Sequence, residues 1–145
     1  MSRLAACALL LSASALGAAP VPKELLKDFK TEGMWEMVSI DAYGRLLKHK
    51  EGLHWNLDDQ GFMTSSAGPG TPAIKSSLQF TFHPGERTVE YRTVTGTRIC
   101  PGLFKLEGDT LVICCNLKAN GERPKAIGTG AENYVWTMKR VKGAK

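Results

Sequence analysis

The sequence predicts an all-β protein, an eight-stranded antiparallel up-and-down barrel that follows a short N-terminal helix. Three observations lead to this fold class. Short segments from residue 33 onward alternate apolar and polar residues, turn residues separate these segments, and one hairpin buries its apolar faces in a consistent register. Closing sequential hairpins into a barrel removes the exposed edges that an open sheet would present. A sandwich of two sheets is the alternative fold.

The first 17 residues are typical of a cleaved signal peptide. Arg3 supplies a positive start, Leu4 to Leu16 form an apolar run, and small residues begin at Gly17. A membrane span would need about 20 apolar residues, and no later segment is long and apolar enough. The sequence therefore predicts export to the periplasm or the cell exterior. Alternatively, residues 4–7 match a lipobox, in which Cys7 would be lipidated.

Residues 18–32 form a predicted leader and short helix. Pro20 and Pro22 favour an extended leader, whereas residues 23–30 fit a short amphipathic helix with Leu25, Leu26 and Phe29 on one face. Residues 33–145 then make up one barrel domain, which is long enough to bury a sizeable core.

Eight strands are predicted within this domain, each bounded by Gly, Pro, Asp or Asn residues. Alternation supports several of them, because apolar residues recur at every second position and so share one face of the sheet. The expected ranges are about 34–41, 52–57, 62–67, 76–83, 88–94, 97–106, 110–117 and 134–141.

The sixth and seventh strands form the hairpin with the clearest register. Gly108-Asp109 suits a two-residue turn. With that turn, Leu106 faces Leu111 and Phe104 faces Ile113, so both strands bury apolar residues on the same side.

The same register places Cys100 on the face of Cys115, one diagonal step from directly opposite, and turns Cys114 to the other face. An exported protein meets an oxidising compartment, which favours a disulfide. Diagonal spacing is slightly long for that bond, although a bulge at Pro101 would close it. A Cys100–Cys115 disulfide and a set of small buried thiols therefore both remain open.

An ordered set of motifs points to a family. Gly33-Met34-Trp35 follows the predicted helix, residues 106–114 and 122–125 come next, and a closing strand ends in Met138-Lys139-Arg140. From about Leu25 to Val141 this set resembles the small secreted lipocalin-like domains that are expanded in planctomycete bacteria, a family without an assigned function. The resemblance implies a calycin-type barrel with structural roles for Gly33, Trp35 and Arg140. Arg140 would cover the Trp35 ring at one barrel end, a cation–π contact of roughly 0.5–2 kcal/mol.

The sequence shows no pattern that predicts catalysis, a metal site or a cofactor. His49, His54 and His83 stand at no metal-ligand spacing and are predicted to be surface residues, with His54 pointing outward. The formal charge is +5, but the basic residues are scattered and form no stripe with exposed aromatics. Nucleic-acid binding is therefore not expected.

Six aromatic residues are predicted to line the barrel interior. An eight-stranded barrel is just wide enough for side chains or one small ligand, so these residues either fill the core or surround a cavity. The first hypothesis is an exported barrel that binds a small apolar or amphipathic ligand. The alternative is a protein-interaction module, an inhibitor or envelope component, whose filled barrel presents the 42–51, 67–75 and 118–133 loops. The candidate ligand-binding residues are Trp55, Phe80, Phe82, Tyr91, Phe104 and Trp136.

Overall fold

The structure is a computed structural model of the 145-residue chain. It describes residues 29–47, 52–67, 71–72, 74–93, 99–118, 121–128 and 130–143. The predicted signal peptide over 1–17, including the lipobox at Cys7, lies outside the described residues, as do residues 23–28 of the predicted helix. Phe29 and Lys30 are described and belong to no helix, and the described ranges contain no helix at all. No helix capable of crossing a membrane is found within these ranges.

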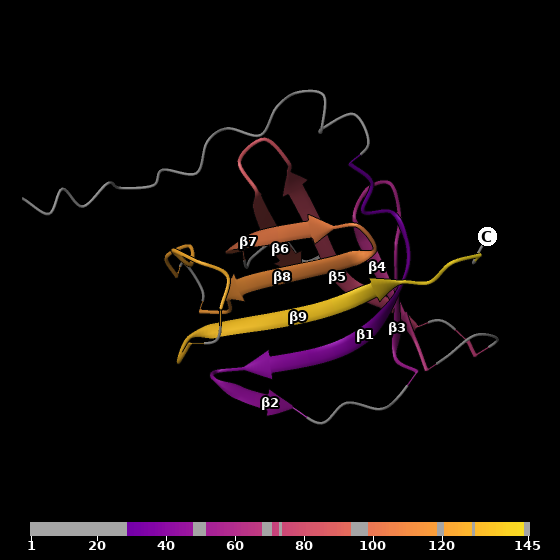
Figure 1. The fold of residues 1–145 in the computed structure, drawn as a ribbon, viewed down its shortest axis with the longest axis horizontal. Helices are drawn as coiled ribbons and strands as arrows, with labels where there is room; N and C mark the ends of the chain where they lie inside the picture. Colours follow the sequence, from indigo (N-terminus) through magenta and orange to yellow (C-terminus); the bar gives the residue numbers. More distant parts are fainter. Residues whose placement is uncertain are drawn as a thin grey trace, which may run out of the picture.

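The described residues form nine strands in one antiparallel sheet. Neighbours in the sheet follow the order β2-β1-β3-β4-β5-β6-β7-β8-β9 (Figure 1). The strands are β1 (Gly33–Ala42), β2 (Arg45–Leu47), β3 (His54–Leu57), β4 (Phe62–Ser66), β5 (Ile74–His83), β6 (Thr88–Thr93), β7 (Ile99–Glu107), β8 (Thr110–Asn116) and β9 (Asn133–Arg140).

The sheet closes into a barrel because its first and last long strands pair. Trp35 is opposite Arg140 and Ala42 is opposite Tyr134, with a bulge between Met37 and Ser39. In Figure 1, β9 in yellow lies directly beside β1 in purple. Eight strands form the ring, so the predicted eight-stranded antiparallel barrel is confirmed and the two-sheet sandwich is wrong.

All eight predicted strands are present, and the β7–β8 hairpin has the predicted register, with Leu106 opposite Leu111 and Phe104 opposite Ile113. The ninth strand, β2, was not predicted. It pairs with the last three residues of β1, outside the ring, and all three of its residues are exposed. An exposed strand of three residues carries no apolar alternation, which is the signal that identified the others.

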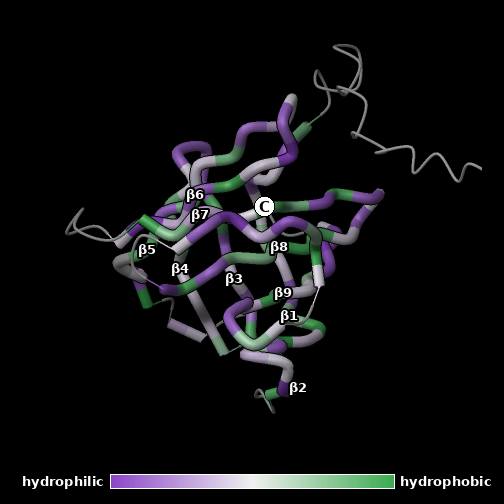
Figure 2. The backbone as a smooth tube through the Cα atoms, turned by 90° about the vertical axis from the view of Figure 1, so that its left-hand side faces the viewer, coloured by the Kyte–Doolittle hydropathy of each residue, from purple (hydrophilic) through white to green (hydrophobic). Residues whose placement is uncertain are grey.

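The core lies inside the barrel and is built from the inward faces of the strands. Hydrophobic and hydrophilic stretches alternate along the chain in Figure 2. Each large side chain that is fully buried contributes roughly 1.5–3 kcal/mol relative to an exposed one. The buried core cluster consists of Trp35, Met37, Trp55, Leu57, Met63, Phe80, Val89, Phe104, Leu111, Ile113, Cys115, Trp136 and Met138.

The up-and-down order gives the barrel two different ends. Strands β1, β4, β6 and β8 end at one end, which we call the loop end. The turns after β3, β5 and β7 lie at the other end, together with the segment Phe29–Glu32 that precedes β1. We call this the Phe29 end, because the ring of Phe29 packs there against Phe82 and Phe104.

Candidate functional site

The Phe29 end is held together by Trp35 and Arg140. The Arg140 guanidinium lies over the Trp35 ring, 4.3 Å from its centroid. Its two terminal nitrogens donate to the carbonyl oxygens of Lys30 and Glu32, at 2.5 and 2.8 Å. Trp35 Nε1 donates to the carbonyl of Thr31 at 2.7 Å. Two side chains from opposite ends of the sequence thus fix three consecutive carbonyls of the Phe29–Glu32 segment.

Gly33 makes room for this arrangement. Its φ of +114° lies in a region that L side chains rarely adopt, and an added Cβ would lie 3.3 Å from the nearer Arg140 nitrogen. A side chain at this position would strain the backbone and press on the guanidinium. The glycine of the Gly-x-Trp motif at the start of β1 is therefore required for steric reasons.

Replacing Arg140 by Met should lower the free energy of unfolding by about 2–3 kcal/mol, because the stacking contact and two charge-assisted hydrogen bonds are lost together. Arg140→Lys should recover only part of the loss, since an ammonium lacks the planar fork that reaches two carbonyls. Urea unfolding of the three proteins measures both values. A Lys variant as stable as the wild type would show that charge alone is sufficient.

The six candidate aromatic residues belong to one continuous cluster of rings inside the barrel. Trp136 is central, with ring centroids 5.7 Å from Trp55 and 6.1 Å from Phe80 and Tyr91. Phe80 is 6.2 Å from Phe82, which in turn is 5.1 Å from Phe104. At these distances the rings contact one another. The middle of the barrel is therefore filled by side chains.

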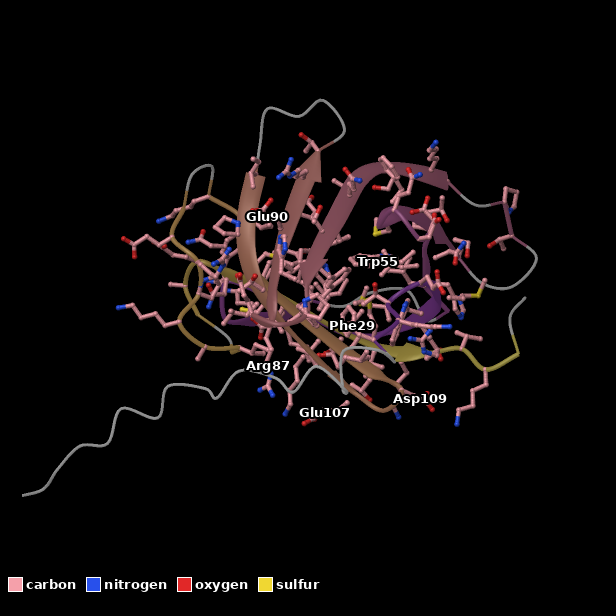
Figure 3. All side chains as sticks on the ribbon, turned by 90° about the horizontal axis from the view of Figure 1, so that it is seen from above. Phe29, Trp55, Arg87, Glu90, Glu107 and Asp109 are labelled. Atoms are coloured by element: carbon pink, nitrogen blue, oxygen red, sulfur yellow. The ribbon has the colours of Figure 1, made fainter. Side chains whose placement is uncertain are left out.

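A pocket of about 360 Å³ lies at the Phe29 end, partly open to solvent. It is bounded by the segment 29–32 on one side and by the β3–β4 turn, 58–61, on the other. Phe80, Thr81, Phe82 and Pro84 complete its lining. Figure 3 labels Phe29 and Trp55 within the ring of strands, whereas Glu107 and Asp109 lie at its periphery. Two of the six candidate residues, Phe80 and Phe82, thus line a pocket whose other walls were not predicted.

The wall formed by the β3–β4 turn is fixed by its own hydrogen bonds. One carboxylate oxygen of Asp58 accepts from the backbone N–H groups of Gln60 and Phe62, at 2.9 and 2.8 Å. The carbonyl of Gly61 accepts from the N–H of Phe80 at 2.9 Å. Asx-type bonds of this kind hold a turn in one conformation. The turn is thereby joined to β5 next to the pocket.

The pocket combines aromatic and charged groups. Half-buried Phe29 and Phe82 supply apolar surface, while Glu32, Asp58 and Asp59 supply carboxylates at the exposed rim. Lys30 is the lining residue with a positive charge. Such a pocket suits a molecule with an apolar part and a polar part.

No protein-family model, curated protein or solved structure matches this chain. The expected contact between Trp35 and Arg140 is present. The barrel itself follows from the strand pairing and needs no relative to support it.

The three cysteines in the described residues are buried free thiols, so the Cys100–Cys115 disulfide is not formed here. Gly102, not Cys100, lies directly opposite Cys115, which leaves Cys100 at the predicted diagonal position. A diagonal neighbour is farther than a disulfide prefers. Burial raises the pKa of the Cys115 thiol, and Cys114 and Cys100 raise it further.

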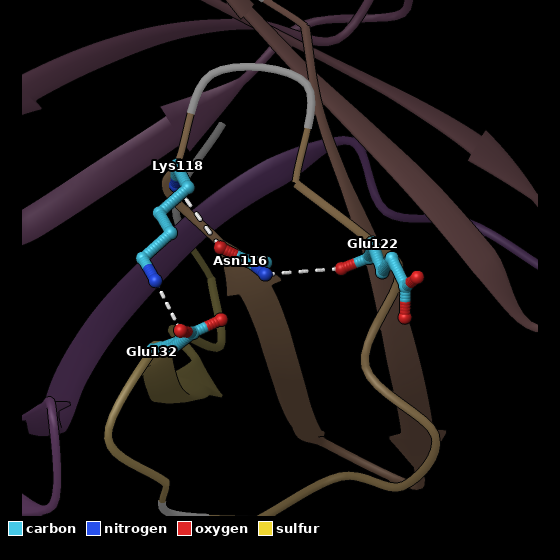
Figure 4. A network of polar contacts seen from close by, with 4 residues as sticks. All are labelled: Asn116, Lys118, Glu122 and Glu132. Atoms are coloured by element: carbon cyan, nitrogen blue, oxygen red, sulfur yellow. Dashed lines mark hydrogen bonds and ion pairs between the residues drawn. The ribbon is translucent and has the colours of Figure 1, made fainter.

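Cys114 lies on the opposite face of β8 and is covered by the 121–128 segment, where its Sγ is 3.7 Å from the carbonyl of Gly128. Asn116 anchors this segment (Figure 4): it accepts from the N–H of Lys118 at 3.0 Å and donates to the carbonyl of Glu122 at 3.1 Å. Lys118 also pairs with Glu132 across the loop. The loop after β8 is thus attached to the outer face of the barrel.

Asn116→Ala should increase the rate at which a thiol reagent modifies Cys114 by about tenfold. The change removes two hydrogen bonds that close the loop, and each ~1.4 kcal/mol lost from a local closing equilibrium multiplies the open population by ten. Burial raises the pKa of Cys114, so labelling at pH 8 reports loop opening rather than a reactive thiolate. The double variant Asn116→Ala, Cys114→Ser is the control, and an unchanged rate in the single variant would contradict the anchoring role.

The histidines do not form a site in the described part of the chain. His54, predicted to point outward to the surface, is 6% exposed and its Nδ1 donates to the carbonyl of Gly52 at 2.6 Å, so that prediction was wrong about its exposure. His83 is exposed at the end of β5, and His49 lies outside the described residues. Among the described residues, no three His, Cys, Asp or Glu side chains group as metal ligands would.

The loop end exposes several large apolar side chains. They lie in the β1–β2 hairpin and at the starts of β5 and β7. Leu46 and Ile74 are 73% and 72% exposed. Exposed apolar side chains that form a contiguous patch are a feature of contact surfaces. The exposed set is Tyr43, Leu46, Leu47, Ile74 and Ile99.

Proposed function

We propose that this chain is an exported small barrel that binds a small amphipathic molecule in the pocket at the Phe29 end. The observation that carries the proposal is the pocket itself, about 360 Å³ in volume and lined by Phe29 and Phe82. Ligand pockets in proteins begin at about 300 Å³ and combine apolar walls with a few polar groups. The apolar run that precedes Gly17 supports export.

The charges around the pocket suggest which polar group the ligand carries. The lining residues include three with carboxylate side chains and one with an ammonium. An anionic group at the rim would meet like charges, whereas a cationic group would be attracted to them and to the aromatic faces below. We therefore expect the preferred ligand to be a small cationic amphiphile.

Isothermal titration calorimetry with three octyl amphiphiles below their micelle concentrations tests the proposal. The probes are octyltrimethylammonium, octyl glucoside and octyl sulfate, which share one tail and differ in charge. The cation should bind most tightly, with a Kd on the order of 0.1 mM because the pocket is partly open to water. Equal affinities for all three would contradict the charge preference.

Two matched Trp substitutions locate the binding. Gln60→Trp places a large side chain in the wall of the pocket and should weaken binding at least tenfold. Leu46→Trp places the same side chain at the loop end, where it should leave the affinity unchanged. If both variants bind as the wild type does, or if the wild type binds none of the probes, the proposed site is wrong.

The exposed apolar residues at the loop end favour a second candidate function, contact with another protein. Leu46 and Ile74 come from different strands and are both largely exposed. The double variant Leu46→Asp, Ile74→Asp would place charges on this surface without altering the core. Native mass spectrometry of the protein purified from its own host distinguishes the candidates. A retained small molecule that Gln60→Trp removes supports the first, and a stoichiometric protein partner that the Asp variant removes supports the second.

A further inference from the structure

Phe29 occupies a special position relative to the proposed pocket. Its ring centroid is 5.1 Å from that of Phe104 and 6.2 Å from that of Phe82, and these two rings are themselves 5.1 Å apart. Phe29 is also a lining residue of the pocket. The Phe29 ring therefore contacts the barrel core on one side and borders the space proposed for the ligand on another.

The way in which Phe29 is held differs from that of the other rings. Phe82 and Phe104 belong to β5 and β7, where Phe82 is paired with Val89 of β6 and Phe104 with Ile113 of β8. Phe29 comes from a segment outside any strand, whose following carbonyls are bound by the side chains of Arg140 and Trp35. The ring of Phe29 therefore packs into the end of the barrel although Phe29 belongs to none of its strands.

From this geometry we infer that Phe29 is a specificity-determining residue: its ring fills the inner part of the binding site and limits the length of apolar group that the pocket accepts. The inference rests on the proposed function and deepens it. The ligand class is a cationic amphiphile with a short tail, which ends against Phe29 and Phe82. A longer tail would need the place beside Phe82 and Phe104 that the Phe29 ring now takes.

Removing the ring should open that place to the pocket. Truncating a large side chain leaves a cavity where its neighbours cannot collapse, and apolar cavities accept small apolar groups. Here the neighbours Phe82 and Phe104 are held in the sheet by pairing with Val89 of β6 and Ile113 of β8. The space left by Phe29→Ala would therefore be continuous with the existing pocket and lined by two aromatic rings.

A chain-length series tests this inference. Butyl-, hexyl-, octyl- and decyltrimethylammonium are titrated into the wild type and Phe29→Ala by calorimetry. In the wild type we expect affinity to rise with the first additions and then level off, because the longer tails cannot advance. In Phe29→Ala the affinity should continue to rise, and the decyl compound should bind at least tenfold more tightly than it binds the wild type.

Two further variants make the result interpretable. Phe29→Leu keeps part of the apolar volume, so its affinity should level off at an intermediate length, and it serves if the Ala variant fails to fold. Tyr91→Ala removes another half-buried ring of the same cluster, one that does not line the pocket, and should leave the wild-type length dependence unchanged.

The outcomes separate the inference from the proposed function. If the wild type binds the series and Phe29→Ala and Phe29→Leu level off at the same length as it does, Phe29 sets no limit and the inference is wrong. If both variants lose affinity for every member, Phe29 is a wall that the ligand needs, and the inference is equally wrong. If the wild type binds no member, the proposed function itself fails.

Discussion

Gly61→Ala should destabilise the barrel by about 5 kcal/mol or prevent folding, the largest effect we expect from one substitution. A Cβ at this position would lie 1.9 Å from the carbonyl oxygen of Phe80, closer than any real contact. The backbone also has a φ of +78°, which strains residues other than glycine. Relief of the clash would separate the β3–β4 turn from β5 and break the bond between Phe80 N–H and the Gly61 carbonyl.

Gly44→Ala is the matched control for Gly61→Ala. Its φ is +76°, nearly the same, but nothing lies within 4 Å of an added Cβ. The control should therefore cost only the backbone strain, about 1 kcal/mol. Urea unfolding of both variants separates the strain from the clash. A Gly61→Ala protein within 1 kcal/mol of Gly44→Ala would show that the turn can move away from β5 at little cost.

Trp136→Ala should lower the free energy of unfolding by about 3–5 kcal/mol, the usual range for truncating a buried Trp. Trp136 is 6% exposed, and its ring contacts those of Trp55, Phe80, Tyr91 and Tyr134. These neighbours come from β3, β5, β6 and β9, which surround the barrel axis. A void at this point cannot be filled by moving one strand alone.

Tyr43→Ala is the control for the loss of an aromatic ring. Tyr43 contacts Tyr134 edge-on at 6.2 Å but is 54% exposed, so its removal should cost less than about 1 kcal/mol. Near-ultraviolet circular dichroism gives a second measurement, because Trp136→Ala should reduce the signal from the coupled rings and Tyr43→Ala should not. A loss below about 1.5 kcal/mol for Trp136→Ala would mean that the cluster does not pack as a unit.

The fold was predictable to the extent that it depends on local signals. The Gly108-Asp109 turn and the apolar alternation around it determine the β7–β8 register, which the structure confirms. The same alternation located the other long strands, because a period of two puts every second residue in the core. Three exposed residues at 45–47 lack this period, and so β2 was missed.

The pocket was less predictable because its walls come from separate parts of the sequence. The aromatic residues of β5 were expected inside the barrel, but the opposite wall is the 29–32 segment, whose first two residues were expected to be helical. The covering of Cys114 by the loop after β8, and the burial of His54, depend in the same way on contacts outside the strand concerned. Strand periodicity determines which side a residue faces, and it does not determine what covers that side.

The pairing of β1 with β9 has a consequence for how the barrel folds. Every other pair in the ring joins strands that are close in sequence, whereas this seam brings residue 35 to residue 140. Pairing β1 with β9 therefore carries the entropic cost of closing a loop as long as the whole domain. We expect this pairing step to limit the folding rate even when the hairpins form early. During synthesis the ring has to stay open until its final strand is available, so the apolar faces of the earlier strands remain uncovered for most of translation.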